Sequence, residues 1–233
     1  MARKPSKRHT AAAKLVDAAK TYPLSEAVQI LKQMPKGKSD ETIDLNFRLG
    51  VDPKQSDQMV RGTVALPHGS GKNVRVLVFA KGVAAEAATA AGADIVGFED
   101  LIKKVSEGFQ DFDVAVATPD AMGEVRKLGK VLGPRGLMPN PRTGTVTDDT
   151  AKAVKECKAG RVEFKLDKSG NVHVVAGKVS FEPAHIEANG KAVIDAIVKA
   201  RPATAKGRFI ETATLASTYS PGIRVDVSPF VRG

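Results

Sequence analysis

The middle of the chain alternates apolar runs with amphipathic segments. The run Asn73–Ala80 is almost continuously apolar and rich in β-branched residues, which is typical of a strand buried on both faces of a parallel sheet. Glycines at 92 and 108 end the helical patterns that follow. The predicted elements are strands at 73–80, 94–96 and 113–119 and helices at 83–91, 98–108 and from Pro119 onward. Three successive strand–helix units predict a doubly wound α/β layer.

The two ends of the chain show a different pattern. Residues 42–49 alternate strictly, with apolar side chains at 43, 45, 47 and 49, so they predict a strand with one polar face. A helix is predicted at 25–34 with Ser25 as its N-cap. Residues 161–181 predict two strands that turn over 167–171, followed by a helix at 183–200 and strands at 208–216 and 222–227. These elements are typical of an antiparallel α+β unit.

Neither end alone has enough elements to close a core. We therefore predict one discontinuous α+β domain, built from residues 1–67 and 160–233, that is interrupted by an inserted α/β domain at 68–159. The segments LPHGSGK and KAGR at the two crossings contain the glycine and proline expected of connections between domains.

The net charge of the chain indicates what kind of partner it binds. The 233 residues carry a formal net charge of +10, with a sequence pI near 9.7, which favours a polyanionic partner such as nucleic acid. The predicted split domain holds nine of these ten net charges. No apolar run is long enough for a membrane span, the basic start lacks the apolar core of a secretory signal, and a single cysteine excludes an internal disulfide. We expect a cytoplasmic protein with no membrane partner.

Candidate catalytic and cofactor chemistry is sparse. Gly69–Lys72 resembles part of a phosphate-binding loop, but it precedes a strand, and Asn73 stands where a magnesium-binding Ser or Thr is needed. No glycine-rich dinucleotide fingerprint follows a predicted strand. The four histidines lack metal-ligand spacing, and Cys157 fits a helix interior better than a nucleophile. We expect no catalytic residues, no metal and no cofactor.

Residues 129–147 form the least ordinary stretch, GKVLGPRGLMPNPRTGTVT. Its glycines and prolines predict an ordered loop without a helix, anchored by Leu132, Leu137, Met138 and Val146. The stretch contains three basic residues, Lys130, Arg135 and Arg142, and no acidic residue. It is therefore a candidate for a second, transient RNA contact, with a purely structural loop as the open alternative.

This loop closely resembles the signature of the family of the protein numbered one of the bacterial large ribosomal subunit. The segments SDQMVRGTVALPHGSGK, AGADIVGFEDL, VATPDAMG and KAGRVEFKLDKSG resemble the same family in its order, so the resemblance extends over nearly the whole chain. It implies a two-domain, chain-crossing architecture. It also implies binding to large-subunit (23S-type) rRNA within a mobile stalk, together with other ribosomal components. Involvement in release of exit-site tRNA and repression of the messenger of its own operon are further implications.

The resemblance also implies the RNA-binding residues. They are Lys36, Lys38, Ser39, Thr42, Lys165, Lys168, Ser217, Thr218, Tyr219 and Ser220. The family usually has Phe in place of Ser39 and Thr-Met-Gly in place of 218–220. A close RNA contact that relies on glycine's lack of a side chain is therefore not expected to carry over to Ser220. With no Trp and two Tyr, a base-stacking platform is not expected, and recognition should depend on phosphates, 2′-hydroxyls and RNA shape.

Two other classes of protein remain open from the residues alone. One is an α/β enzyme with a nucleotide site in the inserted domain. The other is a protein that binds nucleic acid without sequence preference.

Overall fold

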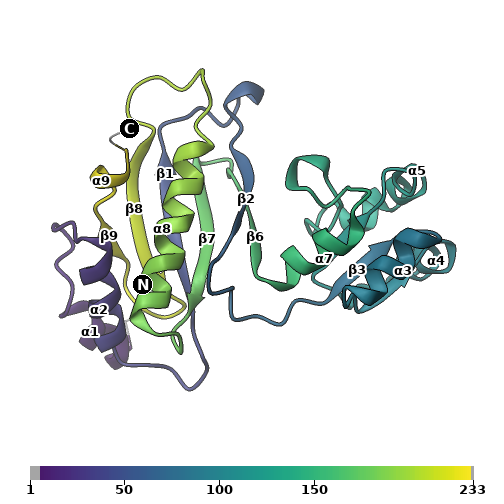
Figure 1. Ribbon diagram of the computed structural model, residues 1–233. Helices are drawn as coiled ribbons and strands as arrows, with labels where there is room; N and C mark the ends of the chain where they lie inside the picture. Colours follow the sequence, from purple (N-terminus) through teal and green to yellow (C-terminus); the bar gives the residue numbers. More distant parts are fainter. Residues whose placement is uncertain (1–5, 232–233) are drawn as a thin grey trace. The chain divides into compact units, whose positions relative to one another are not determined.

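A computed structural model describes residues 6–231 of the chain (Figure 1). Its contacts divide the chain into two compact units. Unit 1 combines Met1–Gly71 with Val162–Gly233, and unit 2 is Lys72–Arg161. The contacts do not show whether each unit folds on its own. The division into a domain of residues 1–67 and 160–233 and a domain of residues 68–159 therefore stays a prediction.

Unit 1 is built around a four-stranded antiparallel sheet with the strand order β7-β1-β8-β9. The strands are β1 (Thr42–Leu49), β7 (Asn171–Lys178), β8 (Ile210–Ser217) and β9 (Ile223–Val225). The predicted alternation of β1 is confirmed, because its four apolar side chains are each at most 2% exposed. The opposite face of β1 carries the polar residues Thr42, Asp44, Asn46 and Arg48.

Two helices cover the apolar face of this sheet, α2 (Leu24–Gln33) and α8 (Pro183–Lys199). Pro183 begins α8, where its fixed φ suits the first turn and its missing N–H is not needed. The predicted N-cap Ser25 is wrong: α2 begins one residue earlier, with Pro23 at the N-cap and no side-chain hydrogen bond there. The remaining short helices are α1 (Lys7–Ala13), η1 (Ser56–Gln58) and α9 (Ser228–Val231).

The strands on either side of the 167–171 turn do not form the hairpin that their sequence suggests. Strand β6 (Arg161–Lys165) pairs with β2 (Arg61–Ala65) in a separate two-stranded sheet, whereas β7 pairs with β1. A single bridge between Leu166 and Val172 joins the two arms of the turn. Phe164 is buried on β6, and its ring lies so close to Gly62 that a Cβ there would be 2.7 Å away. Packing between distant segments therefore determines the partner of β6.

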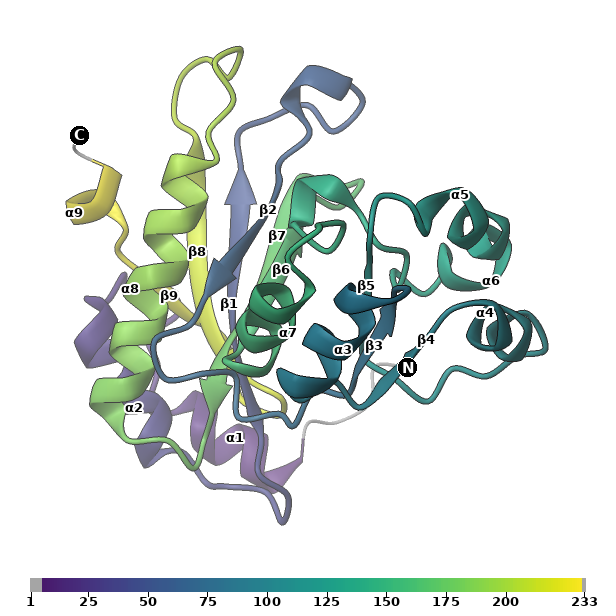
Figure 2. The same ribbon diagram turned by 45° about the vertical axis from the view of Figure 1, so that its right-hand side comes forward.

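Unit 2 contains the predicted doubly wound layer. A three-stranded parallel sheet has the order β4-β3-β5, from β3 (Val76–Phe79), β4 (Ile95–Gly97) and β5 (Val114–Ala117). Helices α3 (Val83–Ala90) and α7 (Thr150–Lys158) pack on one face, and α4 (Glu99–Ser106) packs on the other (Figure 2). Alternate residues of β3 enter the two cores, with Leu77 and Phe79 in one and Val76 and Val78 in the other. Both faces of β3 are therefore buried, as its apolar run predicts.

The chain between β5 and α7 departs from prediction in two places. Pro119 lies in a turn, and the helical segment starts at Met122, continuing as α5 (Met122–Val125) and η2 (Arg126–Leu128). The glycine-rich stretch is not free of helix, since Gly129–Leu132 forms α6 and Pro141–Thr143 forms η3. Leu132 is fully buried and holds that turn in the core, which outweighs the low helix propensity of glycine.

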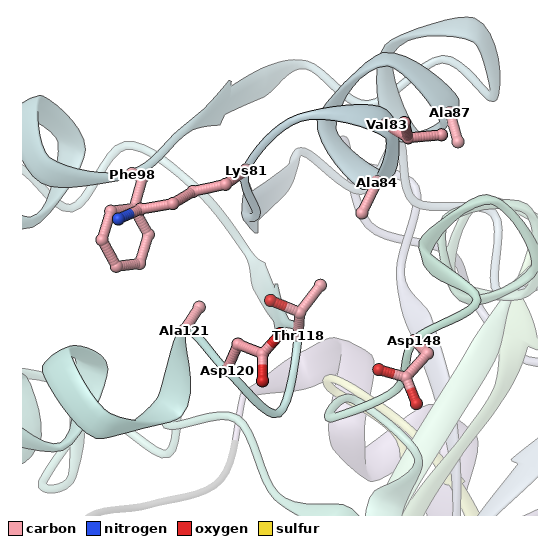
Figure 3. Close-up of a pocket in the computed structure, with 9 residues that line it drawn as sticks. All are labelled: Lys81, Val83, Ala84, Ala87, Phe98, Thr118, Asp120, Ala121 and Asp148. Carbon is pink, nitrogen blue, oxygen red and sulfur yellow. The ribbon is translucent and has the colours of Figure 1, made fainter.

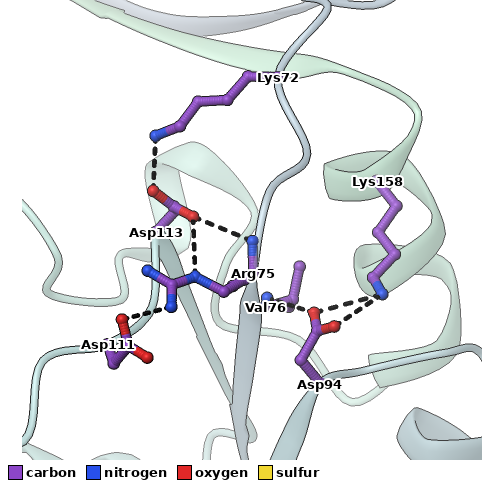
Figure 4. Close-up of polar contacts among 7 residues, drawn as sticks. All are labelled: Lys72, Arg75, Val76, Asp94, Asp111, Asp113 and Lys158. Carbon is purple, nitrogen blue, oxygen red and sulfur yellow. Dashed lines mark hydrogen bonds and ion pairs between the residues drawn. The ribbon is translucent and has the colours of Figure 1, made fainter.

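Two aspartates at the amino ends of the parallel strands bind residues near the first and last positions of unit 2 (Figure 4). Asp113 pairs with the Lys72 ammonium and accepts from the Arg75 backbone N–H at 3.1 Å. Asp94 accepts from the Val76 N–H at 2.9 Å and pairs with Lys158 at 3.2 Å. Hydrogen bonding to Lys72 and the Arg75 N–H lowers the pKa of Asp113. Lys72 is thus paired within its own unit, consistent with Gly69–Lys72 being a crossing and not a phosphate loop.

Candidate nucleic-acid interface

Two segments that are far apart in the sequence meet at the start of β1. The N–H of Thr42 donates to the Thr218 hydroxyl at 3.2 Å, and the N–H of Thr218 donates to the Thr42 carbonyl at 3.1 Å. The Lys178 ammonium also donates to the Thr42 hydroxyl at 2.8 Å. The start of β1 and the end of β8 therefore lie side by side, and the predicted residues before β1 and after β8 flank this place. These seven residues are Lys36, Lys38, Ser39, Thr42, Ser217, Thr218 and Tyr219, and Ser220 closes the turn after them.

Glu41 is the residue that holds these segments together. Its carboxylate accepts from the Gly37 N–H at 2.8 Å, the Ser217 hydroxyl at 2.6 Å and the Tyr219 N–H at 3.3 Å. Its side chain is 5% exposed, and Arg8 on α1 lies 3.7 Å from it. We call residues 36–42 with 217–220 the Glu41 junction. A single glutamate before a strand gave no signal of this role in the sequence, because its partners lie up to 178 residues away.

The charge of Glu41 is favoured despite its burial. Burial raises the pKa of the carboxyl, but the hydrogen bonds from Ser217, Gly37 and Tyr219 and the positive charge of Arg8 together lower it below its ordinary value. An ionised carboxylate with several donors is held more firmly than a neutral one. Glu41 is therefore ionised near neutral pH.

The polar groups around this carboxylate face outward. Lys36, Lys38, Ser39 and Thr218 are exposed, and the Tyr219 side chain is 53% exposed with the Arg8 guanidinium 4.7 Å from its ring centre. Arg8 therefore spans the buried carboxylate and the exposed ring. Two lysines, several hydroxyls and an aromatic ring on a fixed backbone form a surface suited to phosphates and ribose hydroxyls.

The remaining predicted residues lie elsewhere in unit 1. Lys165 is exposed on β6, and Lys168 is exposed in the turn before β7. This turn adjoins Arg48, whose guanidinium donates to the Ser169 carbonyl. Arg48 and Thr42 lie at opposite ends of β1, about 20 Å apart for an extended strand of this length. The structure does not bring Lys165 and Lys168 into the Glu41 junction.

A polar row crosses the sheet between these two places. His173, Asn46, Thr214 and Arg224 are register partners on β7, β1, β8 and β9 in turn. The His173 Nδ1 lies 2.7 Å from the Asn46 Oδ1, and both His173 and Arg224 are exposed. Sequence reasoning found the polar face of β1 but did not assign the other three residues, because strand order is needed to align them.

The loop at 129–147 is held by hydrogen bonds within it and to the end of β5. The Asn140 N–H donates to the Thr145 hydroxyl at 2.8 Å, and Thr145 and Thr147 pair with Ala117 at the end of β5. Lys130 and Arg135 are exposed, and the side chain of Arg142 lies outside the described part of the structure. Within the described residues, neither Lys130 nor Arg135 has an ion-pair or side-chain hydrogen-bond partner.

Comparison with known families identifies the family of the chain. The family model described as Ribosomal protein L1p/L10e family matches residues 31–221 of the 233-residue chain. The chain belongs to this family. The resemblance noted in the sequence is thereby confirmed, and the matched range contains the whole Glu41 junction and the 129–147 loop.

Membership has direct consequences for function. The family consists of ribosomal proteins that bind large-subunit rRNA and is not an enzyme family, so this chain is a ribosomal rRNA-binding protein. Over residues 6–231, no helix is long and apolar enough to cross a membrane. Over the same residues, no three His, Cys, Asp or Glu side chains gather closely enough to hold a metal ion. Cys157 is buried on α7, and burial raises the pKa of its thiol.

Proposed function

We propose that this chain binds a folded helical region of 23S-type rRNA in the mobile stalk of the large subunit. The Glu41 junction makes the contact in this proposal. The same surface binds the messenger of the chain's own operon and represses its translation, and the stalk acts in the release of exit-site tRNA. The observation that carries the proposal is the buried Glu41 carboxylate, which fixes two exposed basic and hydroxyl-rich segments on one rigid backbone.

Charge supports placing the contact in unit 1. The predicted split domain holds nine of the ten net positive charges. A stacking platform is absent from the composition, so a surface of lysines, hydroxyls and backbone groups must supply the specificity. A rigid surface loses less conformational entropy on binding than a mobile loop does.

A competition experiment tests the proposal. Labelled stalk rRNA fragment is bound to the full chain at moderate salt and displaced by unlabelled fragment or by an equal mass of duplex DNA. We expect duplex DNA to compete about 10³-fold less well, which is the lower range for specific over nonspecific binding. Lys36→Ala should weaken binding of the fragment, whereas Lys104→Ala, on the exposed face of α4, should not. Equal competition by duplex DNA would contradict the proposal.

We also propose that Lys130, Arg135 and Arg142 make a second, transient RNA contact with the departing tRNA. The support is that Lys130 and Arg135 are exposed and unpaired within the described residues, on a loop whose backbone is held by other groups. Reversing the charges of Arg135 and Arg142 should leave stalk-fragment affinity unchanged and slow tRNA release in reconstituted ribosomes. A lower melting temperature with normal release would show that the loop is structural.

The domain division is a proposal of the same kind. If residues 1–67 and 160–233 fold together without the insert, joining Leu66 to Arg161 through a short glycine linker should give a folded protein. That protein should keep most of the affinity for the stalk fragment. A folded product that has lost specific binding would place the contact in the insert.

A further inference from the structure

Unit 2 contains a hollow of about 480 Å³ at the carboxyl ends of its parallel strands (Figure 3). Lys81, Phe98 and Thr118 follow β3, β4 and β5, respectively, and all three line it. From β3 the chain passes to β4 on one side of it and then crosses to β5 on the other side. The direction in which strands are added to the sheet therefore reverses between β3 and β5. Ligands of open α/β sheets bind at the carboxyl end of such a reversal.

One wall of the hollow suits a single phosphate. Gly82 is the N-cap of α3, and no side chain caps the helix there. The first backbone N–H groups of a helix lack partners within the helix and attract anions. Gly82 has a φ of 55°, which favours glycine, and a Cβ on it would meet nothing within 4 Å, so this backbone borders open space. Lys81 precedes it, with its ammonium over the Phe98 ring at 3.8 Å and 3.5 Å from Glu99.

The floor of the hollow holds the side chain of Thr118. Thr118 is 8% exposed, and Figure 3 shows its side chain beside Asp120 at the base of the space below α3. Within the described residues, its hydroxyl has no hydrogen-bond partner, and the carboxylates of Asp120 and Asp148 have none either. Among the described residues, no fully buried side-chain polar atom lacks a hydrogen bond, so the Thr118 hydroxyl opens onto the hollow, where a ligand can reach it.

These groups differ in what they can bind. The N–H groups at the start of α3 and the Lys81 ammonium can bind an anion. Asp120, Asp148 and Thr118 can accept hydrogen bonds from hydroxyl groups. Acidic side chains at this edge of α/β sheets bind ribose hydroxyls in this way. Ala84, Ala87, Ala121 and Phe98 provide an apolar wall of the kind that covers a base.

We propose that this hollow binds one ribonucleotide that has a phosphate on its 5′ oxygen and a free 2′,3′-diol. The turn after β3 has one glycine and lacks the fingerprint that a pyrophosphate requires, so a single phosphate is expected. Two sources share this chemistry: a free nucleoside monophosphate and the 3′-terminal nucleotide of an RNA. The site is separate from the Glu41 junction and does not depend on the proposed rRNA contact.

The test uses the full chain and measures amide chemical shifts and binding isotherms with AMP, 2′,3′-dideoxy-AMP, the dinucleotide CpA and magnesium chloride. We expect saturable AMP binding that shifts amides of Lys81–Ala84 and Thr118–Ala121, and at least a tenfold loss with the dideoxy compound. Tighter binding of CpA than of AMP would identify an RNA 3′ end as the source, and the reverse order a free nucleotide.

Variants then separate the site from nonspecific attraction. Lys81→Ala and Thr118→Val should each weaken AMP binding at least fivefold, whereas Lys104→Ala should not change it. All three should retain the wild-type affinity for the stalk rRNA fragment, which separates this site from the proposed function. If Thr118→Val does not fold, the AMP affinity of Lys81→Ala and the comparison of AMP with 2′,3′-dideoxy-AMP decide whether the hollow binds the nucleotide. The proposal is overturned by no saturable binding of AMP or CpA, by equal binding of the dideoxy compound, or by magnesium alone saturating the same amides.

Discussion

The Ser217 hydroxyl donates a hydrogen bond of 2.6 Å to the Glu41 carboxylate, although 176 residues separate them. The bond joins the end of β8 to the residue that precedes β1. These strands are neighbours in the antiparallel sheet, so the contact reinforces a pairing that the backbone already makes. Its effect is to fix the exposed side chains on both segments relative to one another.

Replacing Glu41 by Gln should loosen the junction. The amide keeps the size of the side chain but loses the charge that strengthens its hydrogen bonds, so we expect a loss of about 1.5–3 kcal/mol in unfolding free energy. Affinity for the stalk rRNA should also fall. Chemical denaturation and fragment binding measure the two effects, and Glu26→Gln on the exposed side of α2 is the control. Unchanged stability and affinity would show that Glu41 does not organise the site.

The contribution of Glu41 should depend on pH in a defined direction. Its pKa is lower in the folded protein than its ordinary value of 4.5. The stabilisation is therefore fully present above pH 4.5 and is lost as the pH falls through the folded-state pKa. We expect the difference in unfolding free energy between wild type and Glu41→Gln to shrink over that range. A difference that grows on acidification would contradict the assigned ionisation.

The salt dependence of binding reports how far the RNA extends across unit 1. If roughly five to eight phosphates are neutralised, log K should fall against log salt with a slope of about −4 to −7. Lys38→Ala should make the slope shallower by nearly one unit. Lys168→Ala should do the same only if the RNA extends about 20 Å along β1 to the far turn. No change for Lys38→Ala would place that residue outside the contact.

Tyr219 offers a separate test of the exposed edge of the junction. Its ring is half exposed beside Arg8, and its N–H belongs to the Glu41 network. Removing the ring by Tyr219→Ala should cost about 1–3 kcal/mol of RNA binding if it stacks on RNA or its hydroxyl is buried there. Tyr219→Phe separates these effects, because it keeps the ring and loses only the hydroxyl. Wild-type binding by the Ala variant would mean that the ring makes no contact.

Local patterns predicted most of the fold. The alternation at 42–49 and the apolar run at 73–80 identify their strands. A strand buried on one face alternates apolar and polar residues, and a strand buried on both faces is apolar throughout. Features set by distant partners were not predictable. Strand β6 pairs with β2 and not with its neighbour β7, and α6 forms around the buried Leu132 despite its glycines.

The same distinction applies to the site. The exposed lysines and hydroxyls of the Glu41 junction follow from the family resemblance. Glu41 itself does not stand out, because its importance comes from partners at Gly37, Ser217 and Tyr219 that meet only in the folded chain. Thr118 has the same character, since only the fold shows that its side chain lines a hollow together with residues that follow the other two strands of the sheet.

In the proposed complex, rRNA contacts the Glu41 junction. Amide hydrogen exchange of the full chain, with and without the stalk rRNA fragment at moderate salt, locates the contact along the chain. We predict slower exchange on RNA binding at residues 36–42 and 217–220, with little change at α3 and α4. Protection confined to residues 72–161, with the junction exchanging as in the free protein, would place the rRNA contact outside the Glu41 junction.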